Sequence, residues 1–212
     1  MLMITNCFYV RRIVTTRSEQ KKQQILKAAS ILFCEQGYGV SMDAIALKAE
    51  VSKQTVYAHF KTKDDLFDTC IRAKCVDNQL DDSLLEDTRT IDIVLKEFVL
   101  RFQSMLLSEE ACQTYRAAVS QSETHPQLAK VYLQAGPQAT TEMLAEYLQV
   151  QHDNHVIQLS IPAQDAAMQL LLMAHGKVLY WAYLGQKIED SEQQNRRYLE
   201  ACVDMFLKGY SR

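Results

Sequence analysis

Apolar residues recur every three or four positions along most of this chain, which is the spacing of amphipathic helices. The first such pattern begins near Ser18 and ends at Gly37, a residue type at which helices commonly stop. Its apolar positions are Ile25, Ala28, Ala29, Leu32 and Phe33. Later helical patterns cover residues 90–107, 109–121, 126–150, 163–185 and 191–208. Because no alternating pattern of useful length interrupts them, the sequence predicts an all-α fold.

Two interruptions are expected in the later part of the chain. Gly136 and Pro137 lie inside the 126–150 pattern, and a proline within a helix breaks or kinks it. The polar stretch 151–154 is expected to be a loop. The chain has only six Gly and three Pro, and so few turn formers favour long helices over a sheet.

Two short helical segments follow the first long helix, and each begins with a capping residue. Ser41 precedes the first segment, Ser52 precedes a second that runs to Phe60, and Thr62 is the expected cap of a longer helix. Two short helices joined by a tight turn and packed against a preceding helix form a helix-turn-helix. The second helix of such a unit can enter the major groove of DNA.

The second short segment has an outward side rich in hydrogen-bond donors. Val56 and Phe60 are four residues apart and are expected to face inward. The N-terminal end of the segment is best placed to reach base edges, and its later residues to reach phosphates. Each side chain alone could be an ordinary surface residue, but the combination favours DNA binding. The predicted DNA contacts are Ser41, Lys53, Gln54, Thr55, Tyr57, His59 and Lys63.

Charge is divided unevenly along the 212 residues. Residues 1–63 carry ten Lys and Arg against four Asp and Glu, while the rest carries thirteen against twenty-two, for a net charge of −3. A cationic head on an acidic body is expected if only the head meets a polyanion, although a solvated basic face gives the same count.

The sequence offers little for catalysis or metal binding. It contains no Gly-rich phosphate loop, no G-x-S-x-G, no H-E-x-x-H and no C-x-x-C pair, so we predict a non-enzyme without catalytic residues, cofactor or metal. The six scattered cysteines are expected to be reduced core thiols. No run of 18 apolar residues predicts a membrane span, and the first apolar run precedes its arginines, so a cytoplasmic protein is expected.

The stretch SMDAIALKAEVSKQTVYAHFKTKDDLF, residues 41–67, resembles the DNA-binding signature of the tetracycline-repressor (TetR) family. It has the Ile-Ala of the first short helix, the Val-Ser-x-x-Thr-x-Tyr-x-x-Phe of the recognition helix and the Lys before an acidic helix start. The stretch HPQLAKVYLQAGPQATTEMLAEYL is similar to the seventh-helix region of one subgroup. With the helical patterns, the resemblance implies a helix-turn-helix domain over 18–63 and a helical ligand-binding and dimerisation domain over 64–212.

Two residues depart from the family pattern. Glu50 stands where many members have Gly, in the turn between the two short helices, and it is strained if that turn needs a positive φ. Gln54 also replaces a frequent Gly and adds a side chain to the groove-facing end. Residues 1–17 are expected to be a flexible N-terminal segment, in which residues 1–13 are either a basic arm or lie outside the functional fold.

The resemblance implies a homodimer that reads a near-palindrome, with the last two helices forming a four-helix bundle between subunits. At 100° per residue, the 163–185 helix is apolar on two sides, which favours two partners over burial in one large core. The face expected to pack inward carries Met168, Leu171, Leu172, His175, Leu179 and Ala182. The opposite face, expected to form the dimer, carries Leu170, Met173, Lys177, Tyr180 and Leu184.

The resemblance also implies an apolar ligand enclosed by the body, although aromatic stripes are more often plain core. The candidate lining residues are Phe98, Phe102, Tyr115, Tyr132 and His175. We therefore expect a repressor that an unknown small apolar or aromatic effector releases from double-stranded operator DNA. The alternatives are a constitutive DNA-binding dimer without an effector, and an adaptor that binds only proteins.

Overall fold

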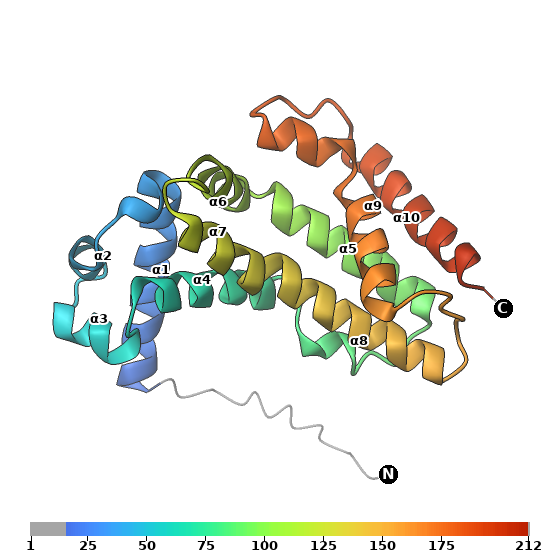
Figure 1. The fold of residues 1–212 in the computed structure, drawn as a ribbon, viewed down its shortest axis with the longest axis horizontal. Coiled ribbons are helices and arrows are strands. Elements are labelled where there is room, and N and C mark those ends of the chain that lie inside the picture. Colours follow the sequence, from blue (N-terminus) through green and yellow to red (C-terminus); the bar gives the residue numbers. More distant parts are fainter. Residues whose placement is uncertain (1–15, 212) are drawn as a thin grey trace, which may run out of the picture.

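The computed structural model describes residues 16–211, which form ten α-helices and no strand (Figure 1). The helices are α1 (Arg17–Gln36), α2 (Met42–Lys48), α3 (Lys53–His59), α4 (Lys63–Asp77), α5 (Ile91–Leu107), α6 (Glu109–Ser120), α7 (Pro126–Leu133), α8 (Ala139–Asp153), α9 (Ala163–Tyr183) and α10 (Glu192–Gly209). The predicted all-α fold is confirmed. None of these helices has the length and apolar content needed to cross a membrane. The expected basic arm over 1–13 lies outside the described residues.

The predicted starts of α2, α3 and α4 are confirmed, whereas α1 begins at Arg17, one residue before the expected start, with Thr16 as its cap. Ser41, Ser52 and Thr62 cap α2, α3 and α4, and the side-chain oxygen of each accepts a hydrogen bond from the backbone N–H three residues later, at 3.0–3.2 Å. Such a cap stabilises a helix by about 1 kcal/mol. Gly37 ends α1 with a φ of 68°, a conformation that Gly adopts without strain. Together these residues fix the angles between the first four helices.

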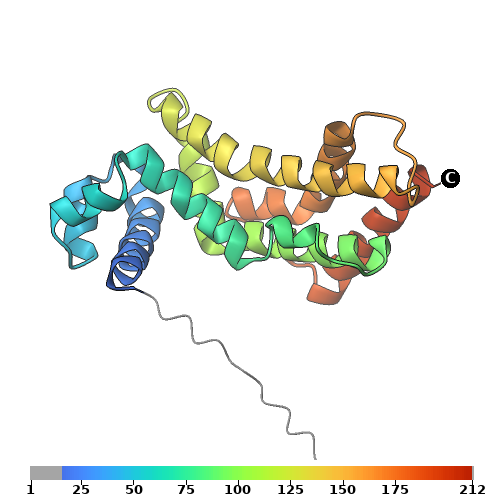
Figure 2. The same ribbon diagram turned by 90° about the horizontal axis from the view of Figure 1, so that it is seen from below.

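Buried side chains form two clusters, and α4 contributes to both. The first cluster joins α1, α2 and α3 to the first half of α4 and also takes in Leu128 and Val131 of α7. The second fills the body between α5, α8, α9 and α10 and includes Cys75 from the end of α4. Figure 2 shows α4 running from the head into the body. Because it packs on α1 and α7 and reaches the body cluster at Cys75, α4 is the structural link between the two parts.

The region around Gly136 and Pro137 is distorted, as predicted, but the chain does not turn sharply there. A π-helical segment, Gln134–Gln138, joins α7 to α8, and Figure 2 shows the two helices following one another nearly in line. Proline has no N–H for the usual bond to the carbonyl four residues earlier, and a π segment relieves the misfit. The predicted loop at 151–154 is wrong, since α8 continues to Asp153 and its polar end is simply exposed.

The largest departure from the sequence-based expectation is a break in α9. Gly176 has φ 58° and ψ −180°, a combination essentially restricted to Gly. A Cβ at this position would lie 2.8 Å from Cε1 of Tyr198, so the site also requires the absence of a side chain. The end of α9 turns away from its first part in Figure 1.

A buried glutamine satisfies the backbone groups that the break exposes. Gln103 of α5 is 1% exposed, and its Nε2 donates to the carbonyl oxygens of Ala174 at 2.7 Å and His175 at 3.2 Å. Asn195 of α10 in turn donates to Oε1 of Gln103. Since unpaired backbone carbonyls are costly when buried, this polar contact stabilises the broken form of α9.

The two faces expected for this helix do not match the packing before Gly176, and the 100° periodicity does not continue beyond it. Leu170, placed on the dimer face, is fully buried in the core of one chain, and Leu172, placed on the inward face, is 61% exposed. Beyond the break, Tyr180 and Leu184 are 69% and 68% exposed. Of the expected dimer residues, Leu170 is therefore unsuitable, whereas those two are accessible.

The two remaining expected dimer residues lie close to the break. Met173 is half-buried and packs against the body cluster. Lys177 is exposed, and its Nζ lies 2.9 Å from Oδ1 of Asp190 in the loop before α10. Met173 is therefore partly accessible and Lys177 more so.

Candidate DNA-binding surface and ligand cavity

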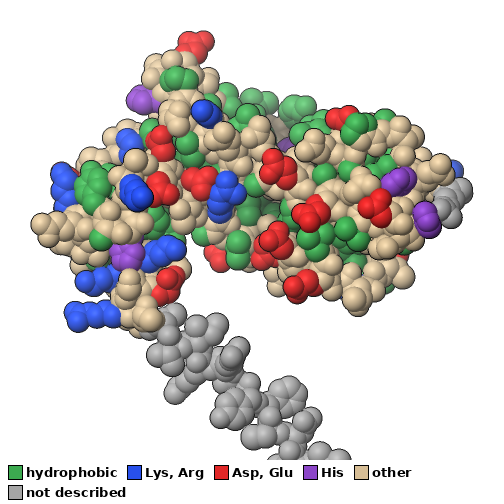
Figure 3. Space-filling view, turned by 60° about the horizontal axis from the view of Figure 1, so that its bottom comes forward, with side chains coloured by type: hydrophobic (Ala, Val, Ile, Leu, Met, Phe, Trp, Pro, Cys, Tyr) green, Lys and Arg blue, Asp and Glu red, His purple; other side chains and the backbone are tan. Residues whose placement is uncertain are grey.

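Helix α3 is held by two buried anchors, as the sequence predicted. Val56 is fully buried and Phe60 is 2% exposed, and both belong to the head cluster. Gln54 and Tyr57 point to the exposed side of the helix, with His59 partly exposed beside them. Figure 3 shows most of the visible Lys and Arg side chains over this end of the molecule, while Asp and Glu are spread over the body. The head therefore presents α3 within a cationic surface.

Several of the predicted DNA contacts already have partners within the head. Nζ of Lys53 lies 2.7 Å from Oδ1 and 2.9 Å from Oδ2 of Asp43 on α2, and this hydrogen bond raises the pKa of Lys53. The hydroxyls of Ser52 and Thr55 are 2.8 Å apart. The Lys53–Asp43 pair is exposed, so solvent weakens it and a DNA group can compete for the ammonium.

Lys63 has a structural role that the sequence did not reveal. Its Nζ donates to the carbonyl oxygens of Tyr38 at 2.6 Å and Val40 at 3.4 Å and lies 4.2 Å from the centre of the Tyr38 ring. Partial burial lowers the pKa of Lys63. The ammonium therefore holds the segment between α1 and α2, and only one of its three N–H groups is left for a phosphate.

The turn between α2 and α3 contains a strained residue. Glu50 has a φ of 53°, the left-handed conformation that the sequence analysis identified as unfavourable for a residue other than Gly. This conformation costs a side-chain-bearing residue about 1–2 kcal/mol. The turn is formed despite this cost because the N–H of Val51 bonds to the carbonyl of Ala46 at 3.1 Å.

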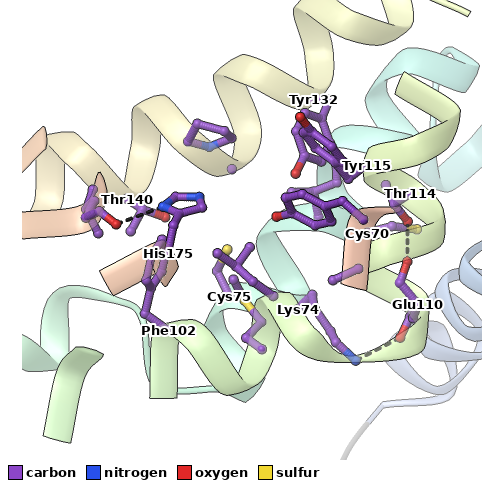
Figure 4. A pocket seen from close by; sticks show the side chains of 18 of the residues that line it. Cys70, Lys74, Cys75, Phe102, Glu110, Thr114, Tyr115, Tyr132, Thr140 and His175 are labelled. Carbon is purple, nitrogen blue, oxygen red and sulfur yellow. Dashed lines mark hydrogen bonds and ion pairs between the residues drawn. The ribbon is translucent and has the colours of Figure 1, made fainter. Parts of the chain in front are cut away.

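A cavity of about 170 Å³ lies where α1 and α4 of the head meet α5 to α9 of the body. Four of the five predicted ligand residues line it: Phe102, Tyr115, Tyr132 and His175 (Figure 4). Phe98 does not line it, and instead stacks on Phe102 with ring centres 6.2 Å apart. The aromatic stripe predicted from helical spacing is therefore partly cavity wall and partly core.

The cavity also has walls that the sequence analysis missed. Tyr183 lies beyond the break in α9 and stacks on Tyr115 with ring centres 3.9 Å apart. Nη1 of Arg116 donates to the carbonyl of Ala182 at 2.9 Å, which holds this segment against α6. A continuous α9 would have given Tyr183 a different orientation, and the glycine at 176 was the only signal in the sequence.

Three cysteines line the cavity, and their chemistry fits reduced thiols. Burial raises the pKa values of Cys34, Cys70 and Cys75, that of Cys70 to about 12. These thiols are therefore protonated and poor nucleophiles near neutral pH. The cysteines within residues 16–211 form no disulfide, and the same residues contain no His, Cys, Asp or Glu group arranged to hold a metal ion.

An ion pair closes one side of the cavity. Nζ of Lys74 on α4 lies 2.7 Å from Oε2 of Glu110 on α6, as drawn in Figure 4. Both side chains line the cavity and are partly exposed. Because their charges are opposite, the pair adds no net charge to the cavity wall.

The fold and these two sites define a transcriptional regulator with a helix-turn-helix head. Residues 25–70 match the family described as bacterial regulatory proteins, tetR family, and residues 93–212 match the family described as AefR-like transcriptional repressor, C-terminal domain. The protein belongs to the TetR family of transcriptional regulators.

Relatives resemble the chain over nearly its whole length. The transcriptional regulator YvkB of Bacillus subtilis (strain 168) is 25% identical over 193 residues, which cover 89% of this chain and 96% of that protein. A putative TetR-family regulator of Mesorhizobium loti MAFF303099 is 28% identical, with a TM-score of 0.74, over 93% of this chain and all of that one. The flavonoid-responsive regulator FrrA is 30% identical, with a TM-score of 0.68, over 91% and 97% of the chains.

Proposed function

We propose that this protein is a homodimeric repressor that a small apolar or aromatic ligand releases from a near-palindromic operator. The observation that carries the proposal is the shared position of α4. Phe67 and Cys70 of α4 belong to the buried cluster of the head, and both also line the cavity. A ligand that contacts these side chains acts on a helix that packs on α1, and α1 in turn packs on α2 and α3. The flavonoid-responsive relative FrrA supports an aromatic ligand.

The proposed DNA contacts are Gln54, Tyr57 and His59 on the exposed side of α3, with Lys53 once Asp43 releases it. Ser41, Thr55 and Lys63 keep a proposed supporting role at the DNA backbone. Tyr180 and Leu184 on the end of α9 are proposed as dimer contacts. Since its target is DNA, we propose that the protein acts in the cytoplasm.

A constitutive DNA-binding dimer is the second candidate, and the small volume of the cavity, about 170 Å³, favours it. Pockets for drug-sized ligands typically measure about 300–1,000 Å³. The two candidates differ only in their response to a ligand, because both need DNA binding by the head.

The test of DNA binding is a fluorescence-anisotropy titration of a duplex selected from a random library, repeated at several salt concentrations. Phosphate neutralisation gives a linear fall of log affinity with log salt. We expect a steep slope and a preference for the selected duplex over a scrambled one. A protein that binds neither duplex at low salt would not be a DNA-binding regulator, and an adaptor would then be the better proposal.

A further inference from the structure

Hydrogen-bonding groups without protein partners line the otherwise apolar cavity. The hydroxyls of Tyr198 and Tyr210 each hydrogen-bond to another residue, whereas those of Tyr115, Tyr132 and Tyr183 make no such bond within residues 16–211. Burial raises the pKa of Tyr132 to about 12 and also raises that of Tyr183. The hydroxyls of Tyr132 and Tyr183 therefore stay protonated, and each can donate or accept a hydrogen bond.

His175 adds an acceptor to the cavity. Its Nδ1 lies 2.8 Å from the carbonyl oxygen of Leu171, the dashed contact at His175 in Figure 4. A carbonyl can only accept, so Nδ1 carries a proton, and in the uncharged form of the ring Nε2 is then an acceptor. Nε2 has no hydrogen-bond partner among the described residues, and Phe102 holds the ring in an edge-to-face contact with centres 5.5 Å apart. A ligand that donates a hydrogen bond would therefore pair with Nε2 of His175.

The size and charge of the cavity restrict the ligand further. The volume is about 170 Å³, and an apolar protein cavity of about 150 Å³ holds one benzene molecule. One aromatic ring with a small substituent therefore fits without rearrangement. Lys74, the only Lys or Arg of residues 16–211 that lines the cavity, is paired with Glu110, so no uncompensated lysine charge is left for an anionic ligand. The walls thus favour a neutral molecule over a carboxylate.

We propose that the cavity binds a neutral phenol with a single aromatic ring, whose hydroxyl donates to Nε2 of His175. The ring lies among Phe102, Tyr115 and Tyr132, and the tyrosine hydroxyls can bond to a second oxygen on the ligand. This inference rests on the proposed function, because it names the chemical class of the effector. A hydrocarbon of the same size fills the space but leaves the histidine nitrogen without a donor.

The test compares small aromatic probes by calorimetric titration into the full-length protein. 4-Methylphenol and anisole are isomers, but only the first has a hydroxyl donor, and toluene has no oxygen. We expect 4-methylphenol to bind about tenfold more tightly than either, a difference of about 1.4 kcal/mol. We expect 4-methylbenzoate, the anionic analogue, to bind more weakly than all three. Equal affinity for 4-methylphenol and anisole, or no binding of 4-methylphenol at millimolar concentration, overturns the proposal.

The variant His175→Phe tests whether His175 causes the preference for 4-methylphenol. His175→Phe keeps a ring at the position, so toluene should bind within about twofold of the unaltered protein, a change of about 0.4 kcal/mol, while the preference for 4-methylphenol disappears. His125→Phe, at the exposed start of α7 outside the cavity, should leave the preference unchanged. If His175→Phe fails to fold, the comparison of probes on the unaltered protein still decides the proposal.

Failure of this inference is distinguishable from failure of the proposed function. If 4-methylphenol shows the expected preference but leaves operator affinity unchanged, the phenol site stands and release by a ligand is wrong. If anisole or toluene binds as tightly as 4-methylphenol and also releases the operator, the ligand class is wrong and the repressor proposal stands.

Discussion

At the scale of single residues, the turn between α2 and α3 contains a residue whose backbone strain a substitution can remove. Glu50 adopts a φ of 53°, which disfavours any residue with a Cβ. We expect Glu50→Gly to raise the free energy of unfolding by about 0.5–1 kcal/mol, because relief of about 1–2 kcal/mol of strain exceeds the added flexibility of the unfolded chain. Urea denaturation measures the change.

Gln79 provides the matched control, since it has a φ of 55° after the end of α4. Gln79→Gly should give a similar gain without touching the DNA-binding surface. A gain for Gln79→Gly with a loss for Glu50→Gly would show that the side chain of Glu50 stabilises the head and that backbone strain is not the main effect.

The exposure of Gln54 and the hydrogen bonds of Lys63 predict different effects on DNA binding. Gln54→Ala should relax the preference at one or two base pairs by about 1–3 kcal/mol, because its exposed amide can bond to a base edge. Lys63→Ala should weaken binding to all duplexes and flatten the salt slope by about one unit. It should also lower stability by about 1–2 kcal/mol through the lost bonds to Tyr38 and Val40.

Lys61 is a control that separates the loss of DNA affinity from the loss of stability, because its side chain is exposed next to α4. Lys61→Ala should leave the free energy of unfolding unchanged while reducing general DNA affinity. Binding measured across a duplex library checks all three variants. An unchanged base preference in Gln54→Ala would rule out its role in sequence reading.

At the scale of helices, the sequence predicts most starts and ends because their causes are local. The caps Ser41, Ser52 and Thr62 act on N–H groups three residues away, so the sequence contains the whole interaction. The break at Gly176 is different, since it depends on Gln103 and Tyr198 from other helices. Hydrophobic periodicity describes one helix at a time and cannot detect such long-range partners.

The break in α9 predicts a large effect of a single methyl group. Gly176→Ala should destabilise the protein by about 2–4 kcal/mol, because Ala combines a Gly-only backbone conformation with a Cβ 2.8 Å from Tyr198. Gly185→Ala is the control: its φ of 69° is also strained, but no atom lies within 4 Å of the added Cβ. It should cost about 1–2 kcal/mol. Equal losses in the two variants, measured by urea denaturation, would mean that the contact with Tyr198 is unimportant.

At the scale of the whole molecule, the sequence predicts the separate head and body better than it predicts which residues line the ligand cavity. Charge asymmetry and the signature over 41–67 are enough to predict the DNA-binding head. Phe102 and His175, two of the predicted ligand residues, do line the cavity. Helical spacing cannot distinguish Phe98, which stacks on Phe102 in the core, from the residues that line the cavity. It also does not predict that Tyr183, beyond the break, is one of the lining residues. A cavity is a gap between several helices, so its limits depend on tertiary packing.

The exposed end of α9 predicts where the proposed dimer forms. Leu184 is 68% exposed in one chain, and Trp181, the only tryptophan of the chain, is 44% exposed. We expect Leu184→Glu to raise the dimer dissociation constant at least about a hundredfold, because a carboxylate is costly to bury in an apolar interface. Sedimentation velocity measures the dissociation, and the emission of Trp181 should shift to longer wavelength as the dimer separates.

Val156→Glu is the control, because Val156 is 50% exposed in the loop before α9. Its sedimentation and Trp181 emission should match those of the unaltered protein. A Leu184→Glu protein that remains dimeric, or a dimer in which Trp181 stays as accessible as in the monomer, would place the interface elsewhere.

Release of the operator by a ligand requires that binding in the cavity and binding of DNA to the head weaken each other in the same dimer. The most direct measurement is calorimetric titration of 4-methylphenol into the protein alone and into the protein saturated with its selected duplex. Linkage requires DNA to weaken ligand binding by the same factor by which the ligand weakens DNA binding. A tenfold effect corresponds to about 1.4 kcal/mol, and we expect at least this difference. Equal affinity of 4-methylphenol for the free and the DNA-bound protein would contradict the account.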